Sequence, residues 1–442
     1  MFLYNDKSPV TFKDPLPEAV DVVIIGGGVI GISTAWFLRA LGKSVLVCDK
    51  GRVAGEQSSR NWGWVRSMGR DLHEVPIAMQ SIDIWEQLSL ELGEGIGFKR
   101  GGIASFARTE QELAELELWL PVAQEYGLDT RVVSSMAANE LINAPHGRWK
   151  GAVFTPTDGR AEPFSAVKTI AEGLQARGGL VREACAVRTI DQQAGKVCGV
   201  CTEQGYVKTQ LVVCAGGVWS SLLLSNMGIR LPQLAVKGTV ARTATAPEIF
   251  SGAAGLGDVY IRRRRDGGYS VACDLPEHMV GPNSFRFMTK YVPALFSGNE
   301  IRLRLGPDPT QRGFLARNWS GEDASAFEAH RVLNLNPSAK ALSIMRKNLD
   351  KRVPEFESIQ FVESWAGVID TMPDIVPVMD KIDSMPGLFL ATGFSGHGFG
   401  IGPGAGKVMA RMVAGEQPEH DLSRFRFGRF ADGSKMRPGP AL

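Results

Sequence analysis

Residues 22–38, VVIIGGGVIGISTAWFL, decide the fold of this 442-residue chain. The stretch starts with four β-branched residues, continues with glycines at 26–28, and ends in an apolar segment with helical spacing. This order predicts a strand over residues 22–25, a turn, and a helix over residues 29–41, and it favours these elements over a membrane span. A second strand over residues 44–49 completes a βαβ unit, which implies a parallel sheet.

The turn carries the pattern G-x-G-x-x-G, formed by Gly26, Gly28 and Gly31. Between a strand and a helix, the first glycine allows the turn, the second lets backbone N–H groups reach a pyrophosphate, and the third lets helix and strand pack closely. Asp49 ends the second strand, where a carboxylate accepts hydrogen bonds from a ribose diol. An acidic residue there favours FAD or NAD over NADP. The alternative is a glycine turn without a ligand.

A second glycine cluster lies near the other end of the chain, where ATGFSGHGFGIGPGAG places seven glycines between Gly393 and Gly406. We expect it to follow a strand over residues 388–391 and to precede a helix over residues 404–414. Exposed N–H groups at the start of such a helix would stabilise negative charge on a reduced flavin, and only small residues allow that approach. A structural glycine loop is the alternative. Two separated glycine-rich sites suit a long ligand such as FAD better than a single nucleotide.

Composition narrows the class of protein. The chain has 49 Lys+Arg against 47 Asp+Glu and is 44% hydrophobic, which is typical of a globular protein of two or three domains and excludes a disordered chain. A net charge of +2 gives no strong field for nucleic acid, so we expect small-molecule partners. Six scattered cysteines fit a reducing compartment, and no export signal is visible, so a cytoplasmic location is expected.

The rest of the chain alternates between two patterns. The strand Leu211–Cys214 and the terminal third return to the nucleotide-binding pattern, whereas residues 234–272 read as long alternating strands of an antiparallel sheet. We therefore expect an α/β plus α+β architecture with a discontinuous Rossmann-type FAD-binding domain and an antiparallel-sheet substrate-binding domain. The expected FAD-binding domain comprises residues 1–95, 155–230 and 362–442, and the substrate-binding domain comprises residues 96–154 and 231–361.

Four segments together resemble the D-amino-acid-oxidase superfamily of flavoproteins. They are GGGVIGISTAWFL with Asp49, EQSSRNWGWVRSMGRD, VVCAGGVWS and GFSGHGFGIGPGAG, and they span nearly the whole chain. Within the superfamily, GVWSSLLLSNMGI and ESWAGVIDTMPDIVPV are most similar to the bacterial L-amino-acid deaminases, beside glycine oxidase and sarcosine oxidase. The resemblance implies a two-domain enzyme in which FAD lies extended in the first domain and its ring faces a pocket under the antiparallel sheet.

The resemblance also implies which residues hold FAD. Glycines of the first motif would hold the pyrophosphate, Asp49 the ribose and Val187 the adenine, while the loop over residues 61–65 would line the ring and His397 would lie at its pyrimidine end. The expected cofactor-binding residues are Gly26, Gly28, Val29, Ile30, Gly31, Asp49, Lys50, Ser58, Ser59, Asn61, Trp62, Gly63, Val187, Ala215, Gly216, Trp219, Gly367, Gly393, Gly396, His397, Gly398 and Phe399.

Two positions depart from the sarcosine-oxidase branch of the superfamily. Gly367 stands where that branch has a cysteine bonded to the flavin, and residues 364–371 offer no thiol, so we expect noncovalent FAD. Gly400 stands where the branch has a lysine that helps to hold the substrate carboxylate. A carboxylate must therefore be held elsewhere, if the substrate has one.

Arg66 is the candidate for that role, because it ends the flavin-lining loop and its planar fork suits a carboxylate. A surface arginine, or one that contacts the flavin, is the alternative. Arg262 is a second candidate for substrate binding, and the alternative is that it lies in a solvated hairpin. Trp64 and Trp365 are candidates for an aromatic wall, and the alternative is simple core packing. His397 is the catalytic candidate, by shape and hydrogen bonding or as a base. We expect no metal site.

These residues predict FAD-dependent oxidation of an amino acid or related amine. Hydride passes from the carbon bearing nitrogen to flavin N5, and the imine then hydrolyses to an oxo acid and ammonia. The alternatives are a demethylating oxidase of N-alkyl amino acids, a hydroxy-acid dehydrogenase, and a flavin subunit of a larger complex. Oxygen or a membrane quinone would accept the electrons. In the deaminases, the insertion equivalent to residues 282–319 approaches the membrane, so peripheral contact at its inner face is also considered.

Overall fold

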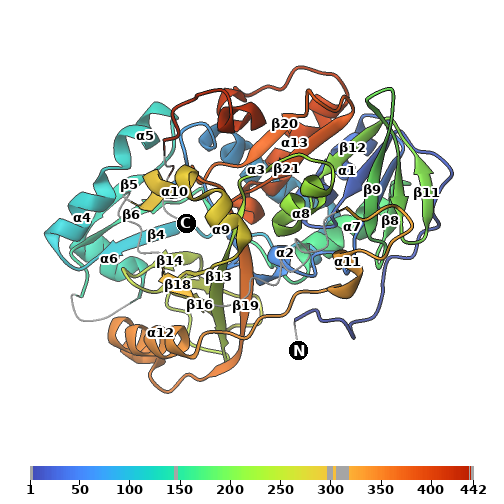
Figure 1. Ribbon diagram of the computed structural model, residues 1–442. Helices are drawn as coiled ribbons and strands as arrows, with labels where there is room; N and C mark the ends of the chain where they lie inside the picture. Colours follow the sequence, from blue (N-terminus) through green and yellow to red (C-terminus); the bar gives the residue numbers. More distant parts are fainter. Residues whose placement is uncertain (1–2, 144–147, 296–301, 305–317, 438, 440–442) are drawn as a thin grey trace.

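A six-stranded sheet forms the centre of the first domain in this computed structural model, which describes residues 3–143, 148–295, 302–304, 318–437 and 439 (Figure 1). The strand order is β20-β21-β12-β1-β2-β8. Strands β1, β2, β8, β12 and β21 are parallel, and β20 pairs antiparallel with β21 at one edge. The strands are β1 (Val22–Ile25), β2 (Val45–Cys48), β8 (Leu180–Arg182), β12 (Leu211–Cys214), β20 (Val378–Lys381) and β21 (Leu388–Thr392).

Both faces of this sheet are covered, as the unbroken apolar run of β1 predicts. Val22 and Ile24 pack into one hydrophobic cluster with the helices, whereas Val23 and Ile25 pack into another on the opposite face. The helices of the first face are α1 (Val29–Ala40), α3 (Val75–Leu92), α7 (Ala166–Ala176) and α13 (Gly398–Val413). The second face carries α8 (Ser220–Asn226) and a small sheet of β9 (Val187–Gln193), β10 (Lys196–Thr202) and β11 (Gly205–Lys208).

A ten-stranded sheet forms the second domain, in the order β18-β17-β13-β16-β15-β14-β4-β6-β5, with β19 also paired to β13. Most pairs are antiparallel, as the alternating sequence predicts, but β14 pairs with β4 and β17 with β18 in parallel. The strands are β4 (Ile103–Ala107), β5 (Arg131–Ser134), β6 (Gly151–Thr155), β13 (Leu234–Thr243), β14 (Ala253–Gly255), β15 (Tyr260–Arg263), β16 (Tyr269–Ala272), β17 (Glu277–Met279), β18 (Arg302–Arg304) and β19 (Phe361–Thr371).

Shorter elements complete the molecule. The hydrophobic core of the second sheet includes Met345 and Leu349 of α12 (Ala339–Arg352). The remaining α-helices and strands are α2 (Gln57–Arg60), β3 (Trp64–Val65), α4 (Glu110–Glu117), α5 (Leu120–Glu125), α6 (Ser135–Leu141), β7 (Gly159–Arg160), α9 (Pro282–Arg286), α10 (Met288–Leu295) and α11 (Ala326–Ala329). Within the part of the chain described here, no helix combines the length and apolar character needed to cross a membrane.

The strand β19 corrects one expected domain boundary. It pairs with β13 from Leu234 opposite Thr371 to Thr243 opposite Phe361. A strand that is hydrogen-bonded over this whole length belongs to the sheet that contains its partner. The boundary expected at residue 362 therefore moves to the end of β19, and the last segment of the first domain begins after it.

The helix α13 starts six residues earlier than the glycine content predicts, at Gly398 instead of Gly404. Glycine is unfavourable in a helix by about 1 kcal/mol relative to alanine, which is why the segment reads as a loop. Here the glycines lie where α13 meets its neighbours. A Cβ atom added to Gly402 would lie 2.6 Å from Val29 Cγ2, and one added to Gly406 would lie 2.5 Å from Ser33 Cβ. Packing against α1 therefore overrides helix propensity.

Replacing Gly406 with valine tests this packing. The new side chain would meet Ser33 and the backbone N of Thr34, 2.8 Å from the added Cβ, so α13 must move away from α1. Overpacking of this kind costs about 1 to 3 kcal/mol of unfolding free energy, measurable by urea denaturation. Gly428→Ala is the control, because that glycine is exposed and its added Cβ would have no neighbour closer than 3.9 Å. Equal stability of the two variants would contradict the role of Gly406 in the packing of α13 against α1.

Candidate active site

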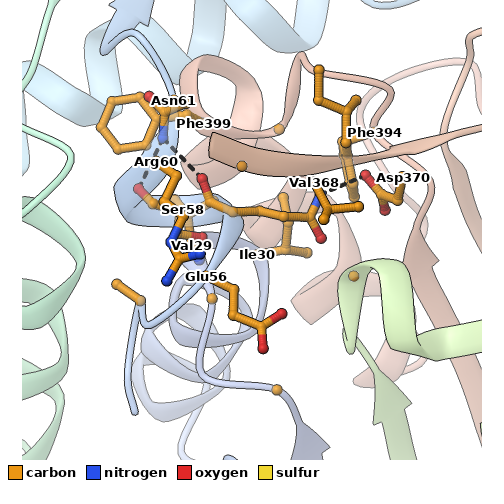
Figure 2. A pocket seen from close by; sticks show the side chains of 18 of the residues that line it. Val29, Ile30, Glu56, Ser58, Arg60, Asn61, Val368, Asp370, Phe394 and Phe399 are labelled. Carbon is orange, nitrogen blue, oxygen red and sulfur yellow. Dashed lines mark hydrogen bonds between the residues drawn. The ribbon is translucent and has the colours of Figure 1, made fainter. Parts of the chain in front are cut away.

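One cavity contacts both glycine clusters. Gly26 and Gly28 line it at the carboxyl end of β1, and Gly396 and Gly398 line it at the start of α13. Strands β13 and β19 of the second sheet contribute further lining residues, among them Thr239. Figure 2 shows Val29, Ser58 and Asn61 gathered beside Phe399, and Val368 near Phe394 and Asp370. The two ends of the chain therefore meet at a single site.

The first glycine motif provides a site for phosphate groups. Gly26 has φ +109°, and an added Cβ would lie 2.4 Å from Ala215 O, so only glycine fits this turn. Gly28 is the N-cap of α1, and the first turn of the helix holds no acidic residue to offset its positive end. Ser58 Oγ accepts a hydrogen bond from the Val29 N–H (2.9 Å), so the Ser58 hydroxyl hydrogen remains available for a phosphate oxygen.

The carboxylate of Asp49 lies at the end of β2, as predicted, and lines the cavity. Its Oδ2 accepts the Gly27 N–H (2.8 Å) and its Oδ1 accepts the Gly51 N–H (2.6 Å). Burial raises the pKa of Asp49 to about 6 in spite of these two donors. Each oxygen keeps a lone pair, so a ribose diol can bind there. The residues present thus fit the dinucleotide that the motif predicts.

Near Asp49, Val187 and Trp219 line the cavity as predicted. Lys50 lines it too, with Nζ 4.3 Å from the centroid of the Trp219 ring. Glu56 accepts hydrogen bonds from Lys50 Nζ (2.7 Å) and Trp219 Nε1 (2.8 Å), and it was not predicted. Arg331 also lines the cavity. It lies far from these residues in the sequence, and no motif near it predicted this position.

The loop between α2 and β3 is held rigidly. Asn61 Oδ1 accepts the Gly63 N–H (2.7 Å), and Asn61 Nδ2 donates to Ser58 O (2.8 Å). Trp62 stacks on Tyr260 of β15 with ring centroids 4.9 Å apart, and Trp64 meets the same ring edge-on at 5.9 Å. Both tryptophans line the cavity, which gives it an aromatic wall next to the second sheet.

His397 is the N-cap of α13 and is fully enclosed. Its Nδ1 lies 3.2 Å from Glu74 Oε2, and neither His397 Nε2 nor Glu74 Oε1 has a hydrogen-bond partner among the described residues. Burial and the charge of Arg70 lower the pKa of His397, so the ring is neutral near pH 7. A neutral ring that donates from Nδ1 to a carboxylate presents a lone pair at Nε2.

Arg66 lies on the aromatic side of the cavity, with its guanidinium carbon 5.4 Å from the centroid of the Trp64 ring. Burial lowers the pKa of Arg66 from the usual range of arginine. Within the described ranges, no carboxylate lies within the 4.0 Å of an ion pair from this guanidinium. Arg66 therefore places at the cavity a guanidinium that has no ion pair among the described residues.

Five predicted residues lie outside the lining of the cavity, and four of them differ from their expected roles. Arg262 is 1% exposed and donates from Nη1 to Glu162 Oε1 (3.0 Å) and from Nη2 to Ser270 Oγ (3.1 Å), so its charge is already paired. Trp365 is 2% exposed and donates from Nε1 to Arg60 O (3.0 Å). These contacts correct the two substrate-binding assignments, because neither side chain lines the cavity.

The other two lie behind the cofactor side of the cavity. Ser59 is buried and donates to Glu56 O (3.2 Å), so its hydroxyl is not presented to a phosphate. An added Cβ on Gly393 would lie 2.4 Å from Met372 Sδ, which makes this glycine a packing requirement. Gly31 also lies outside the lining, in the packing role predicted for it, with an added Cβ 2.0 Å from Gly26 O.

These features define a flavin dinucleotide site, and comparison with known proteins agrees. The chain belongs to the DAO family of FAD-dependent oxidoreductases, whose family model matches residues 21–412. This finding confirms the predicted family, the Rossmann-type fold and FAD as the cofactor.

Individual relatives are distant in sequence. The chain is 26% identical to 4-methylaminobutanoate oxidase (formaldehyde-forming) of Paenarthrobacter nicotinovorans, over 97% of this chain and 48% of the relative. It is 25% identical to glycine oxidase of Pseudomonas putida, over 90% of this chain and 95% of the relative. The chain spans about half the length of the first curated relatives that it matches.

Solved structures show the same fold. L-amino acid deaminase from Proteus myxofaciens, in complex with anthranilate, superimposes with a TM-score of 0.89 at 29% identity, covering 97% of this chain and 99% of that chain. L-amino acid deaminase from Proteus vulgaris gives a TM-score of 0.88 at 26% identity, covering 95% of this chain and 100% of that chain. The similarity thus extends over both domains.

The raised pKa of Asp49 makes FAD affinity depend on pH. The ribose hydroxyls donate to the ionised carboxylate, and in the FAD-free protein this group, with its pKa of about 6, is largely protonated below pH 6. FAD binding must then release a proton, so the Kd falls about tenfold from pH 5 to pH 7. Equilibrium titration with FAD at both pH values measures this change. The Asp49→Asn variant should bind FAD weakly, and its Kd should no longer depend on pH. The same change of Kd with pH in this variant would contradict the role of Asp49 in ribose binding.

The position of Gly367 supports noncovalent FAD. It lines the cavity without a thiol, and the Sγ atom of Cys273, another lining residue, lies 3.9 Å from Ala341 O as a hydrogen-bond donor. We expect acid precipitation of the purified protein to leave all of the flavin in the supernatant. Flavin absorbance that stays with the precipitated polypeptide would contradict this expectation.

Proposed function

We propose that this protein is an FAD-dependent oxidase or dehydrogenase of an amino acid, which converts the substrate to an imine that hydrolyses to an oxo acid and ammonia. The observation that carries the proposal is the unpaired guanidinium of Arg66 on the aromatic wall of the cavity. FAD, when bound, supplies the acceptor for the hydride and with it most of the chemistry. The chain's own residues are therefore required mainly to bind and orient the substrate.

Arg66 supplies the anchor. A guanidinium binds a carboxylate through two parallel hydrogen bonds, which fixes direction as well as distance. The attraction is stronger in this cavity than in water, because Arg66 lies over the Trp64 ring in a partly buried position. An oriented carboxylate limits how the adjacent carbon can face the cofactor, and such orientation lowers the barrier for transfer.

His397 supplies an acceptor at the other side of the cavity. The hydrogen bond to Glu74 fixes the ring and its tautomer, so Nε2 can accept a hydrogen bond. Burial opposes ionisation of Glu74, but the hydrogen bond from His397 and the charge of Arg70 lower its pKa overall. We propose that this neutral imidazole accepts a proton of the substrate amine, since hydride leaves more readily from carbon beside a neutral nitrogen.

A second candidate is the oxidative demethylation of an N-methyl amino acid. The names of two relatives favour it: 4-methylaminobutanoate oxidase (formaldehyde-forming) and sarcosine dehydrogenase, at 26% and 25% identity. Both reactions use the same carboxylate anchor and the same cofactor. They differ in products, because demethylation releases an aldehyde and deamination releases ammonia.

The electron acceptor is oxygen or a membrane quinone. In the second case, a surface near α9 and α10 is the proposed point of contact with the membrane. Exposed apolar side chains support it, and they are Phe285, Met288 and Val292. Such side chains bury their apolar area in a lipid interface. Stoichiometric formation of hydrogen peroxide would identify oxygen as the acceptor.

Anaerobic reduction of the bound flavin tests the function directly. The holoenzyme is mixed without oxygen with a panel of L- and D-amino acids, N-methyl amino acids, and hydroxy acids. We expect loss of the oxidised flavin absorbance with at least one amino acid that has a free carboxylate. Ammonia and aldehyde assays then separate deamination from demethylation. Bleaching by hydroxy acids alone, or by no amine, would refute the proposal.

The variant Arg66→Met tests the anchor in the same experiment. Truncating one partner of a buried charge pair costs about 2 to 5 kcal/mol, so the Kd of the reactive amino acid should rise on the order of 100-fold. Arg66→Lys should recover part of the loss, because it keeps the charge but not the fork. Arg230→Met, on an exposed arginine, is the matched control and should bind normally. A Kd that does not change in Arg66→Met would contradict the assignment.

A further inference from the structure

The cavity contains a second buried guanidinium that the proposed function does not use. Arg70 lies on the segment between β3 and α3, lines the cavity, and is 6% exposed. Gly69, with φ +70°, turns the chain just before it, so that Arg66 and Arg70 reach the same cavity. Burial lowers the pKa of Arg70 to about 9, and the nearby charge of Arg66 contributes. Both side chains are therefore cations near pH 7.

Arg70 has no hydrogen-bonded anion among the described residues. Its Nη1 is buried without a hydrogen-bond partner, and within the described ranges no carboxylate lies within 4.0 Å of the guanidinium. The charges of Glu74 and Asp158 raise the pKa of Arg70, but the hydrogen bonds of these two acids go to other groups. Glu74 binds His397, and Asp158 accepts hydrogen bonds from Ser67 N (2.7 Å), Ser67 Oγ (2.8 Å) and Met68 N (3.2 Å).

The acids that line the cavity do not neutralise Arg70 either. Asp49 and Glu56 lie at the end where the dinucleotide motif is, and Asp274 is exposed to solvent. Asp370 accepts hydrogen bonds from Gln57 Nε2 (2.9 Å) and the Gly393 N–H (2.8 Å). A buried guanidinium N–H without a hydrogen-bond partner is unfavourable, so a ligand that brings an acceptor to Arg70 Nη1 binds more tightly.

The cofactor does not bring that anion. Its pyrophosphate, the charged part of FAD, is assigned to the Gly28 end of α1, and the oxidised ring carries no formal charge. The two arginines also differ in their surroundings. Arg66 lies over the Trp64 ring, whereas Arg70 has a buried Nη1 without a hydrogen-bond partner among the described residues. One small carboxylate bound at Arg66 would leave Arg70 unmatched.

We propose that Arg70 binds a second anionic group of the substrate, so that the substrate is an amine with two carboxylates, such as an acidic amino acid or an N-carboxyalkyl amino acid. This inference rests on the proposed function, since it names the class of amine that the same site takes. Arg66 then holds the carboxylate next to the reacting carbon, and Arg70 holds the distal one. A monocarboxylic amine would leave Arg70 Nη1 without a hydrogen-bond acceptor and bind more weakly.

Inhibitor binding tests this inference without turnover. The holoenzyme is titrated with glutarate and with butyrate, two unreactive acids of similar length, and the flavin absorbance change gives each Kd. We expect glutarate to bind at least tenfold more tightly than butyrate. Arg70→Met should reduce this ratio to near one, and Arg70→Lys should keep a clear preference for glutarate. Arg230→Met is the matched control and should leave the ratio unchanged.

Three results would overturn the inference. The first is equal affinity of the wild-type holoenzyme for the two acids, which needs no variant to fold. The second is an Arg70→Met variant that weakens both acids by the same factor. The third is an Arg70→Met variant that changes the absorbance or reduction potential of the ligand-free flavin but keeps the wild-type ratio of the two Kd values. This result would show that Arg70 acts on the cofactor.

The results for the second anion site and for the proposed function can be told apart. Tighter binding of glutarate through Arg70, together with no reduction of the flavin by any amine, would support the second anion site and refute amine oxidation. Reduction by monocarboxylic amino acids, with no advantage for aspartate, glutamate or iminodiacetate, would support amine oxidation and refute the dicarboxylate preference.

Discussion

The close contact between α1 and α13 is the constraint on which the site depends. These helices begin at the two glycine clusters, and they lie against each other without side chains at Gly402 and Gly406 (Figure 1). The contact fixes the distance between the helix start at Gly28 and the helix start at His397. A cofactor that reaches both points can bind only if this distance is held. Glycine thus contributes here chiefly by allowing close packing.

The second constraint is electrostatic. The cavity holds few charges that the chain itself does not pair, and two of these are the guanidinium groups of Arg66 and Arg70. Unpaired cations in a buried site weaken folding, and they are stabilised by a ligand that carries the opposite charge. This distribution fits an enzyme that positions a substrate beside a reactive cofactor.

Local sequence predicted the first βαβ unit and the position of its glycine turn correctly. The βαβ unit, the glycine motif and Asp49 are contiguous signals, because one turn and two strands fix their relative positions. Local sequence did not predict the features that tertiary packing determines. The start of α13 was missed because helix propensity counts each glycine as unfavourable, whereas contact with α1 requires it. The role of β19 required its partner β13, more than 100 residues earlier in the chain.

The substrate half was harder to predict for a geometric reason. Alternate residues of a strand face opposite sides, and the sequence does not say which side faces the cavity, so Arg262 was assigned to substrate although it pairs with Glu162. The direction of Arg70 depends on the turn at Gly69, which the sequence around it does not reveal. Trp365 resembled Trp64 in its context, but its indole N–H is bonded to Arg60 O on the far side of the wall.

The central claim is that one FAD molecule spans both ends of the chain and presents its ring to a carboxylate held by Arg66. A crystal structure of the holoenzyme with glutarate tests it most directly. The account predicts the pyrophosphate at the Gly28 N–H, the pyrimidine edge of the ring next to His397, and one inhibitor carboxylate within hydrogen-bond distance of Arg66. A flavin ring remote from His397, or a carboxylate that avoids Arg66, would contradict it.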